Sequence, residues 1–146
     1  MRIFRSTLAG KPFERGFQDG PGAVARFNNI ARITIDWHTG DLIVSDRDNH
    51  CIRRVILIKE GNMAVVTTIA GGGYGQMGEA GHADARALEA RFNSPVGVAV
   101  GEEGRIFVGD LCNHCVREIS TSGDVTTFAG MVRVCVCVCV CLYVCV

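Results

Sequence analysis

The sequence predicts an all-β fold made of two copies of one antiparallel sheet. Two stretches about 60 residues apart repeat the same motifs in the same order. Each stretch contains four short runs of apolar and β-branched residues, with turn residues between them. Glycine is abundant, at 18 of 146 residues, which favours tight turns over long helices. Four strands that recur as a unit are typical of a propeller blade, so we expect a partial β-propeller of about two four-stranded antiparallel blades, plus part of a preceding outer strand.

The repeat is defined by a constant spacing between polar residues. Asp46 and Asp110 are 64 residues apart, and Arg53 and Arg117 keep the same spacing. An Asn-His pair begins three residues after each aspartate. Such recurrence indicates a requirement of the fold, because a catalytic residue need occur only once. The candidate structural motif is Asp46, Asn49, His50 and Arg53 in the first copy, and Asp110, Asn113, His114 and Arg117 in the second.

Each copy is expected to form four strands that are separated by turns. The inner runs are apolar on both faces, as is typical of a sheet stacked between neighbouring sheets. The expected strands are residues 31–36, 41–45, 51–56 and 63–70 in the first copy, and residues 96–101, 105–109, 115–120 and 125–129 in the second.

The repeats divide the chain into five segments. The phrase Ser-Thr-Leu-Ala-Gly at residues 6–10 resembles the phrase that closes each copy, which predicts the end of a preceding blade there. The alanine-rich residues 83–90 are expected to form one or two helical turns. The segments are the end of a preceding blade and a linker (1–26), a first blade (27–71), an inter-blade linker (72–91), a second blade (92–130) and a low-complexity tail (131–146).

The tail alternates valine and cysteine and contains five of the eight cysteines. A DNA tract of alternating G and T encodes this alternation in every reading frame. Arg133, Leu142 and Tyr143 interrupt it, and each is one base change from the expected codon. We therefore interpret residues 131–146 as a translated dinucleotide repeat. The alternatives are an aggregation-prone edge strand and a metal site, but Cys-x-Cys in a strand supplies no turn to surround a tetrahedral ion.

The motifs of the second copy resemble an NHL repeat. Residues 95–117 contain Pro-Val-Gly-Val-Ala-Val, then Gly-Arg-Ile-Phe-Val-Gly-Asp, then Asn-His-Cys-Val-Arg. The lead-in Asp-Gly-Pro-Gly-Ala at residues 19–23 is similar to the linker of long-period members of that family. Two features depart from the family pattern: Ile-Ala-Arg at residues 30–32 replaces the usual Pro-x-Gly, and Cys51 and Cys115 stand where Arg or another polar residue is common.

The resemblance implies a β-propeller fold more strongly than any one function. NHL propellers bind proteins, RNA or glycans, and a few relatives are metal-dependent lyases or hydrolases. Function must therefore be argued from the residues of this chain.

The two aspartates admit a functional and a structural interpretation. Asp46 and Asp110 follow a strand, where a carboxylate could face a metal or a ligand. They could equally cap the tight turn by accepting its backbone N–H groups, with Asn49 and Asn113 acting likewise. Because both copies carry the arrangement, we favour the structural role.

The histidines and cysteines are assigned no catalytic or metal role. His50 and His114 could face a central channel, but each opens a strand expected to lie away from it, and neither has a histidine partner nearby in sequence. Cys112 and Cys115 form a Cys-x-x-Cys pair in a turn between strands, without the helix N-terminus that activates a redox thiol. We interpret them as incidental cysteines.

The charge pattern gives no support for RNA as a partner, although RNA stays possible, and no DNA or membrane partner is expected. Lys+Arg and Asp+Glu are balanced at 15 each. Arg53 and Arg117 recur, which favours stacking or pairing with acidic residues of adjacent blades. Arg54 is matched by Glu118 in the second copy, so no continuous basic stripe is formed.

These observations predict a non-catalytic interaction scaffold that presents a binding face to a protein or other macromolecule. We expect no catalytic residue, cofactor or metal site. The alternatives are a metal-dependent propeller enzyme, which would need His or Asp side chains converging on one point, and an RNA-binding NHL module. The N-terminus lacks the apolar run of a signal peptide, and the 13-residue apolar run at the other end is shorter than a membrane span, so the compartment is left open. Two blades alone leave two apolar sheet faces uncovered, which predicts marginal stability or aggregation in isolation.

Overall fold

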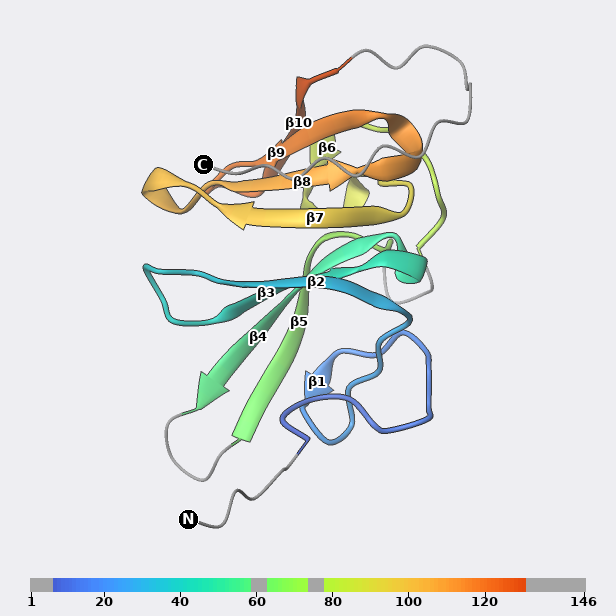
Figure 1. The fold of residues 1–146 in the computed structure, drawn as a ribbon, viewed down its shortest axis with the longest axis vertical. Coiled ribbons are helices and arrows are strands. Elements are labelled where there is room, and N and C mark those ends of the chain that lie inside the picture. Colours follow the sequence, from blue (N-terminus) through green and yellow to red (C-terminus); the bar gives the residue numbers. More distant parts are fainter. Residues whose placement is uncertain (1–6, 59–62, 74–77, 131–146) are drawn as a thin grey trace.

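The chain folds into two five-stranded antiparallel sheets in a computed structural model that describes residues 7–58, 63–73 and 78–130 (Figure 1). We call these sheets blade 1 and blade 2. The predicted all-β fold of two antiparallel sheets is confirmed. Blade 1 has the order β1-β5-β4-β3-β2, and blade 2 has the order β6-β10-β9-β8-β7. The strands of blade 1 are β1 (Gly20–Pro21), β2 (Ile30–Ile35), β3 (Leu42–Asp46), β4 (Cys51–Ile58) and β5 (Met63–Gly71), and those of blade 2 are β6 (Ala85–Arg86), β7 (Pro95–Val100), β8 (Ile106–Asp110), β9 (Cys115–Ile119) and β10 (Asp124–Ala129).

The two blades share one register, including their irregularities. Asp46 pairs with Cys51 in blade 1, and Asp110 pairs with Cys115 in blade 2. A one-turn 3-10 helix connects each pair of strands, η1 (Arg47–Asn49) and η4 (Leu111–Asn113). Two further 3-10 turns are η2 (Ala87–Glu89) and η3 (Glu102–Gly104). Strands β2 and β7 also each carry a register shift near their start. Residues of one blade can therefore be compared with those of the other position by position.

A fifth strand, absent from the prediction of four strands per blade, lies at the outer edge of each sheet. β1 pairs with β5, and β6 pairs with β10. The helical turns predicted for residues 83–90 reduce to the single 3-10 turn η2, because Ala85 and Arg86 extend and pair with β10. Backbone pairing with an existing sheet edge outweighs the helix propensity of a short alanine-rich segment.

The preceding outer strand expected near residues 6–10 is not formed by residues 7–10, which make no strand pairing. Instead, the Gly10 backbone N–H donates to the carbonyl of Gly22. The interpretation of residues 131–146 as a translated repeat falls outside the described residues. Within the described ranges, no helix is long and apolar enough to cross a membrane.

The blades stack face to face, with β7 of blade 2 against β2 and β3 of blade 1 (Figure 1). Apolar side chains of both sheets fill the interface and form one buried cluster. A polar contact fixes the stacking, since the Ser45 hydroxyl of β3 donates to the Val96 carbonyl of β7 at 2.8 Å. The buried cluster contains Ile43, Ile52 and Ala70 from blade 1, Val98, Ile106, Val108, Ile119 and Val125 from blade 2, and Ala90 and Phe92 from the connecting segment.

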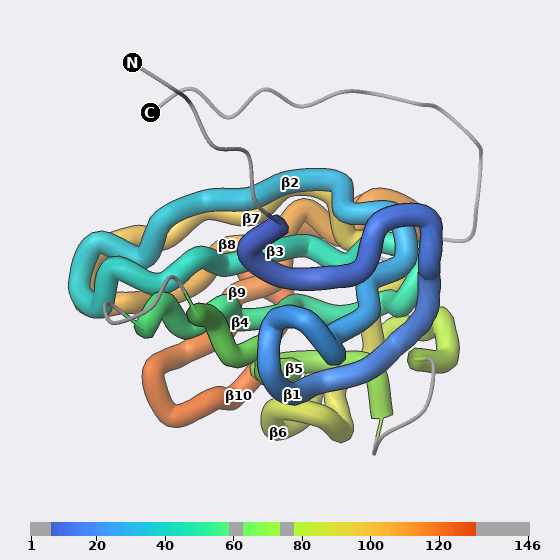
Figure 2. Tube along the Cα trace, turned by 90° about the horizontal axis from the view of Figure 1, so that it is seen from below, coloured from blue at the N-terminus to red at the C-terminus, as the bar shows by residue number. Residues whose placement is uncertain are grey.

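The opposite face of blade 1 is covered only in part. Ala25 and Phe27 of the N-terminal coil pack over Val44, Val55 and Val66. Figure 2 looks onto this face and shows the coil crossing one side of the sheet, away from the β2–β3 turn. The coil repeats what Ala90 and Phe92 do on blade 2, because those residues occupy the equivalent places.

The close of each blade depends on a glycine. Gly71 has φ +72°, and a Cβ there would lie 2.6 Å from the His50 carbonyl oxygen and 2.8 Å from the Phe92 ring. We expect Gly71→Ala to lower the free energy of unfolding by about 1–3 kcal/mol more than Gly40→Ala, in urea denaturation of the full chain. Gly40 is the matched control, with φ +80° and nothing within 4 Å of its added Cβ. Equal effects of the two substitutions would contradict the steric account.

Candidate functional site

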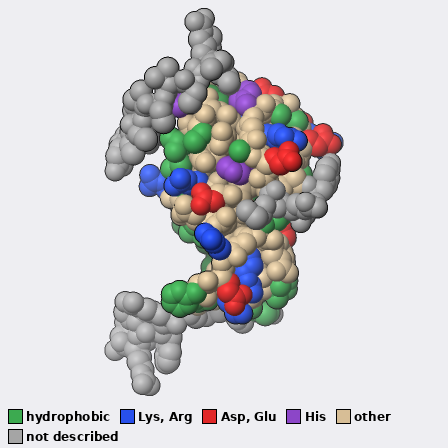
Figure 3. Space-filling view, turned by 90° about the vertical axis from the view of Figure 1, so that its right-hand side faces the viewer, with side chains coloured by type: hydrophobic (Ala, Val, Ile, Leu, Met, Phe, Trp, Pro, Cys, Tyr) green, Lys and Arg blue, Asp and Glu red, His purple; other side chains and the backbone are tan. Residues whose placement is uncertain are grey.

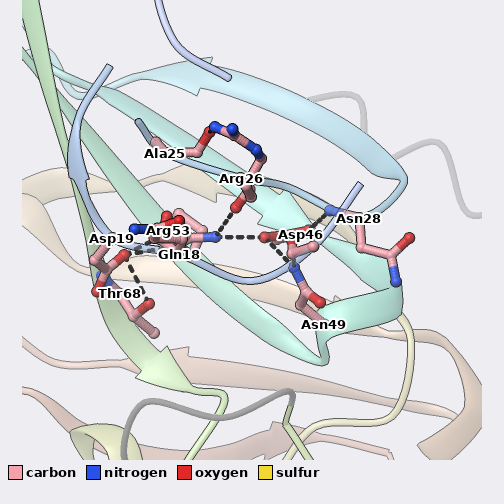
Figure 4. A network of polar contacts seen from close by, with 10 residues as sticks. Gln18, Asp19, Ala25, Arg26, Asn28, Asp46, Asn49, Arg53 and Thr68 are labelled. Atoms are coloured by element: carbon pink, nitrogen blue, oxygen red, sulfur yellow. Dashed lines mark hydrogen bonds and ion pairs between the residues drawn. The ribbon is translucent and has the colours of Figure 1, made fainter. Parts of the chain in front are cut away.

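Three of the four predicted motif residues of blade 1, Asp46, Asn49 and Arg53, meet in a buried cluster (Figure 4). Arg53 lies on β4, and its NH1 donates to Oδ2 of Asp46, at the end of β3, at 2.6 Å. Asn49 donates to the same oxygen at 2.8 Å, and the backbone N–H of Asn28 donates to Oδ1 at 2.8 Å. The side chains of Arg53 and Asp46 are both fully buried. Asp46 is thus held by three donors from three separate segments.

Asp46 was expected to cap the turn that follows it, but the structure shows that it does not. The η1 turn receives no side-chain cap hydrogen bond from Asp46. Its carboxylate instead accepts the N–H of Asn28, which lies 18 residues earlier. Asn49 acts as a donor, to Asp46 and to the carbonyl of Gly16. These side chains bind the N-terminal coil rather than their own turn, because the coil crosses directly over the turn.

The outer side of Arg53 binds the linker through Asp19. Arg53 NH2 donates to Asp19 Oδ1 at 2.7 Å, and its Nε donates to the same oxygen at 3.1 Å. Asp19 Oδ2 accepts the backbone N–H of Thr68 on β5 at 2.9 Å. The guanidinium also stacks on two aromatic rings, Phe17 and Phe27, each 4.9 Å from its centroid. Arg53 therefore joins β3, β4, β5 and the coil that leads into the blade.

Arg117 forms the same cluster in blade 2. It donates to Asp110 at 3.0 Å and to Asp84 of the linker at 2.6 Å, and it stacks on Phe92 at 5.2 Å. Asn113 donates to Asp110 at 2.8 Å. Arg53 and Arg117 pair within their own blade and its linker, so the expected pairing with acidic residues of adjacent blades is wrong. The two clusters remain separate, one in each blade.

Burial dominates the electrostatics of the two inner carboxyls. It raises the pKa of Asp46 and of Asp110, against the lowering effect of hydrogen bonds from Asn49 and Asn113 and of the paired arginines. A raised carboxyl pKa is a feature of some catalytic acids. Here both carboxyls are shut off from solvent and their oxygens are occupied by protein donors, so the arrangement stabilises the blade and offers nothing to a substrate.

The two histidines lie at the ends of the 3-10 turns in left-handed conformation, with φ 52° for His50 and 54° for His114. His50 Nδ1 accepts the backbone N–H of Ser94, at the start of blade 2, at 3.0 Å. His50 therefore links the two blades. In residues 7–58, 63–73 and 78–130, no three His, Cys, Asp or Glu side chains are grouped as a metal site would require.

The Cys-x-x-Cys pair lacks the properties of a redox site. Cys112 is exposed whereas Cys115 is buried, and both are free thiols. Burial raises the pKa of Cys115 to about 11, and the charge of Asp110 adds to this effect. Burial also raises the pKa of Cys51 well above its usual range. A reactive thiol needs the opposite shift.

A groove lies at the junction of the blades, and apart from Arg54 its lining residues were not among the candidates from the sequence. Its volume is about 480 Å³. Arg54 lies in it, held by Asp36 at 3.2 Å and by Asp41 at 3.5 Å. Trp37, between two lining residues in the chain, is 78% exposed. Nothing in the repeat pattern marks this groove, because its residues differ between the blades. The lining residues are Asp36, His38, Thr39, Arg54, Ile69, Glu103, Gly104, Ile106, Ile119, Ser120, Thr121 and Gly123.

The linker aspartates were also missed, although the sequence contained a signal for them. Asp19 and Asp84 are 65 residues apart, as are Phe27 and Phe92. This spacing is within one residue of the 64 that separates Asp46 from Asp110. The repeat therefore extends upstream of each blade and includes both aspartates.

Comparison with known proteins places these blades in a family. The NHL repeat model matches residues 92–119. The chain is 35% identical over 101 residues to NHL repeat-containing protein 2 of Gallus gallus, covering 68% of this chain and 12% of that protein. It is 30% identical over 107 residues to protein SUPPRESSOR OF QUENCHING 1, chloroplastic, of Arabidopsis thaliana, covering 73% and 9%. The chain thus spans about a tenth of the length of these curated relatives.

Solved structures share the fold. An auxiliary nutrient binding protein from Bacteroides ovatus matches with a TM-score of 0.60 and 26% identity, covering 73% of this chain and 26% of that one. Another from Bacteroides thetaiotaomicron matches with a TM-score of 0.58 and 22% identity, covering 67% and 25%.

The buried ion pair yields a first prediction for this site. Asp46→Ala leaves Arg53 buried without its inner partner, and we expect the free energy of unfolding to fall by about 3 kcal/mol or more. Asp48→Ala is the control, because the Asp48 side chain is 41% exposed, and its ion pair with Arg47 and hydrogen bond from Asn29 should together be worth about 1 kcal/mol. Urea denaturation of the full-length variants measures both. Similar small losses for the two would show that Asp46 does not organise the blade.

The linker contact yields a second prediction, on pH. Burial acts to raise the pKa of Asp84, but hydrogen bonds from Thr127 and the charge of Arg117 outweigh it, so the folded pKa is lowered from 3.8. A lowered folded pKa means that the contact stabilises the fold above pH 3.8 and is lost as pH falls through the folded value. We expect the protection of the Thr127 amide against hydrogen exchange to persist down to pH 3.8 and to be lost below it, as Asp84 becomes protonated. In Asp84→Asn, exchange that still accelerates over the same pH range would assign the effect to another group.

Proposed function

Because this chain is an NHL repeat-containing protein, we propose that it is a non-catalytic interaction module whose paired blades present the junction groove to a protein partner. The observation that carries the proposal is the exposed Trp37 beside a groove built from both blades. Tryptophan is among the residues that most often dominate binding energy at protein interfaces.

The division of polar residues supports binding over catalysis. Polar residues that recur, such as Asp46 and Arg53, are buried and bonded within each blade. Polar residues that differ between the blades, such as Arg54 and His38, line the groove. Fold requirements are shared by repeats, whereas recognition distinguishes one repeat from another. The groove therefore contains polar residues that the repeated fold does not require, and these can determine which partner binds.

The chemistry of the groove suits a peptide segment with both apolar and polar side chains. Trp37 offers a large apolar surface, and Ile69, Ile106 and Ile119 contribute to the lining. Arg54 is partly neutralised by two carboxylates, so the groove is no strong anion site. Figure 3 shows the side of the molecule away from the β2–β3 turn of the groove, and there basic and acidic side chains are interspersed, without the one-sign patch that RNA phosphates would favour. The Bacteroides ovatus relative is named for binding rather than for a reaction, which agrees with the proposal.

Selection of a random peptide library on the full chain tests this function. We expect selected peptides to lose about 30-fold in affinity for Trp37→Ala, which corresponds to about 2 kcal/mol for a residue at the centre of an interface. Phe13→Ala is the matched control, because Phe13 is an exposed aromatic outside the groove, and its affinity should be unchanged.

Two results would overturn the proposal. Peptides that bind Trp37→Ala as tightly as the parent chain would place recognition elsewhere. Binding of a random RNA pool that weakens steeply with salt, with no peptide selected, would indicate a nucleic-acid module instead.

A further inference from the structure

We infer that the peptide taken by the junction groove is basic, and that Glu103 of blade 2 binds its lysine or arginine side chain. This inference rests on the proposed function, because it names the chemistry of the partner for the same groove. The walls of the groove are the β2–β3 turn of blade 1 and the β7–β8 and β9–β10 turns of blade 2. The groove is therefore formed by the two blades of this chain.

The turns of the two blades approach each other closely at the groove. Figure 1 shows the β2–β3 and β7–β8 turns projecting on the same side of the stacked sheets. A Cβ added at Gly104 would lie 3.8 Å from Cδ2 of His38 and 3.6 Å from Cγ2 of Thr121. Glu103 precedes Gly104 in this turn and lines the groove. A side chain bound in the groove would therefore lie beside Glu103.

Blade 1 contributes a carboxylate that its turn does not require. The Asp36 N–H donates to the Asp41 carbonyl, and the Gly101 N–H donates to the Arg105 carbonyl, each at 2.8 Å, so the two turns correspond. Glycine thus closes the turn of blade 2 where aspartate closes that of blade 1. The Asp36 side chain is 3% exposed and pairs with Arg54 at 3.2 Å. Asp36 therefore adds a negative charge beneath the groove that has no counterpart in blade 2.

The charge of Arg54 is already balanced by Asp41. These side chains pair at 3.5 Å, and at the equivalent positions of blade 2 Glu118 and Arg105 pair at 3.6 Å with the signs reversed. An ion pair that exchanges its signs between the blades is neutral in both. Arg54 is therefore not available to neutralise the other carboxylates of the groove.

The groove has a negative net charge as a result. Apart from His38, its titratable lining residues are Asp36, Arg54 and Glu103. With Asp41 bound to Arg54, three carboxylates stand against one guanidinium, which gives a net charge of −2. A concave surface of one sign attracts partners of the opposite sign and raises their rate of association.

Glu103 is the carboxylate of this group that a partner can reach. It is exposed, and its side chain forms no hydrogen bond or ion pair with residues 7–58, 63–73 or 78–130. Arg105, two residues later, stacks on Phe107 at 5.8 Å from the ring centroid. Side chains alternate along the strand, and Ile106 between them lines the groove, so Arg105 faces the other side of the sheet.

The apolar lining suits the stem of a long basic side chain. Ile69, Ile106 and Ile119 contribute to the groove, and Ile106 and Ile119 are only 4% and 3% exposed. Lysine and arginine pack their methylene groups on apolar surface while the charged end stays at a polar group. An acidic side chain in the same place would meet charges of its own sign.

Paired glutamine variants of the β7–β8 turn test this inference. We expect peptides selected on the full chain to contain lysine or arginine, and to lose about fivefold in affinity for Glu103→Gln, the effect of an exposed ion pair. Glu102→Gln is the matched control, because Glu102 is the adjacent exposed glutamate of the same turn but does not line the groove. Its effect should stay under about twofold, since solvent and salt screen its charge.

A charge exchange identifies the contact directly. Glu103→Lys should weaken the selected basic peptides further, by about tenfold or more, because like charges then oppose each other. Replacing the lysine or arginine of the peptide by glutamate should restore affinity for Glu103→Lys and weaken binding to the parent chain. Circular dichroism should show unchanged sheet content in every variant.

The outcomes separate this inference from the function on which it rests. Selected peptides that contain no basic residue, equal losses for Glu103→Gln and Glu102→Gln, or an exchanged pair that regains no affinity would each overturn it while leaving peptide binding in place. Failure to select any peptide would instead contradict the proposed function, and this inference with it.

Discussion

The buried pair of Arg53 with Asp46, repeated as Arg117 with Asp110, is the interaction on which each blade depends. A fully buried guanidinium is strongly unfavourable unless charge and hydrogen bonds surround it. The chain meets this requirement by bringing to Arg53 the end of β3, the incoming coil and, through Asp19, strand β5. The position of the linker follows from it, because the outer donors of Arg53 reach Asp19.

The stacking of the blades depends on a different kind of contact. Apolar residues from both sheets supply most of the contact, and the Ser45 and His50 hydrogen bonds set its alignment. Apolar packing between sheets is not directional, so such polar contacts are needed to select one arrangement. The same separation appears across the molecule, with recurring residues forming the blades and differing residues lining the groove between them.

Because the recurring motif residues are buried inside each blade, their geometry does not suit catalysis. Asp46 and Asp110 have the raised pKa values of some catalytic acids, yet each faces an arginine inside a closed cluster. Cys115 has a thiol in a Cys-x-x-Cys pair, yet burial raises its pKa to about 11. The exposed side chains near Trp37, by contrast, are unlike those at the equivalent positions of the other blade.

The repeat, the all-β character and the positions of β2–β5 and β7–β10, to within one or two residues, could be predicted from the sequence, whereas the edge strands β1 and β6 could not. The prediction was possible because alternating apolar runs and turn residues are local properties, and because a repeated spacing reveals a repeated unit. Three features became visible only in the folded chain: Asp46 binds Asn28 rather than its own turn, residues 85–86 form a strand rather than a helix, and Arg54 lies in a groove between the blades. Each of these depends on a partner from a distant segment, and no local pattern specifies which distant groups will meet.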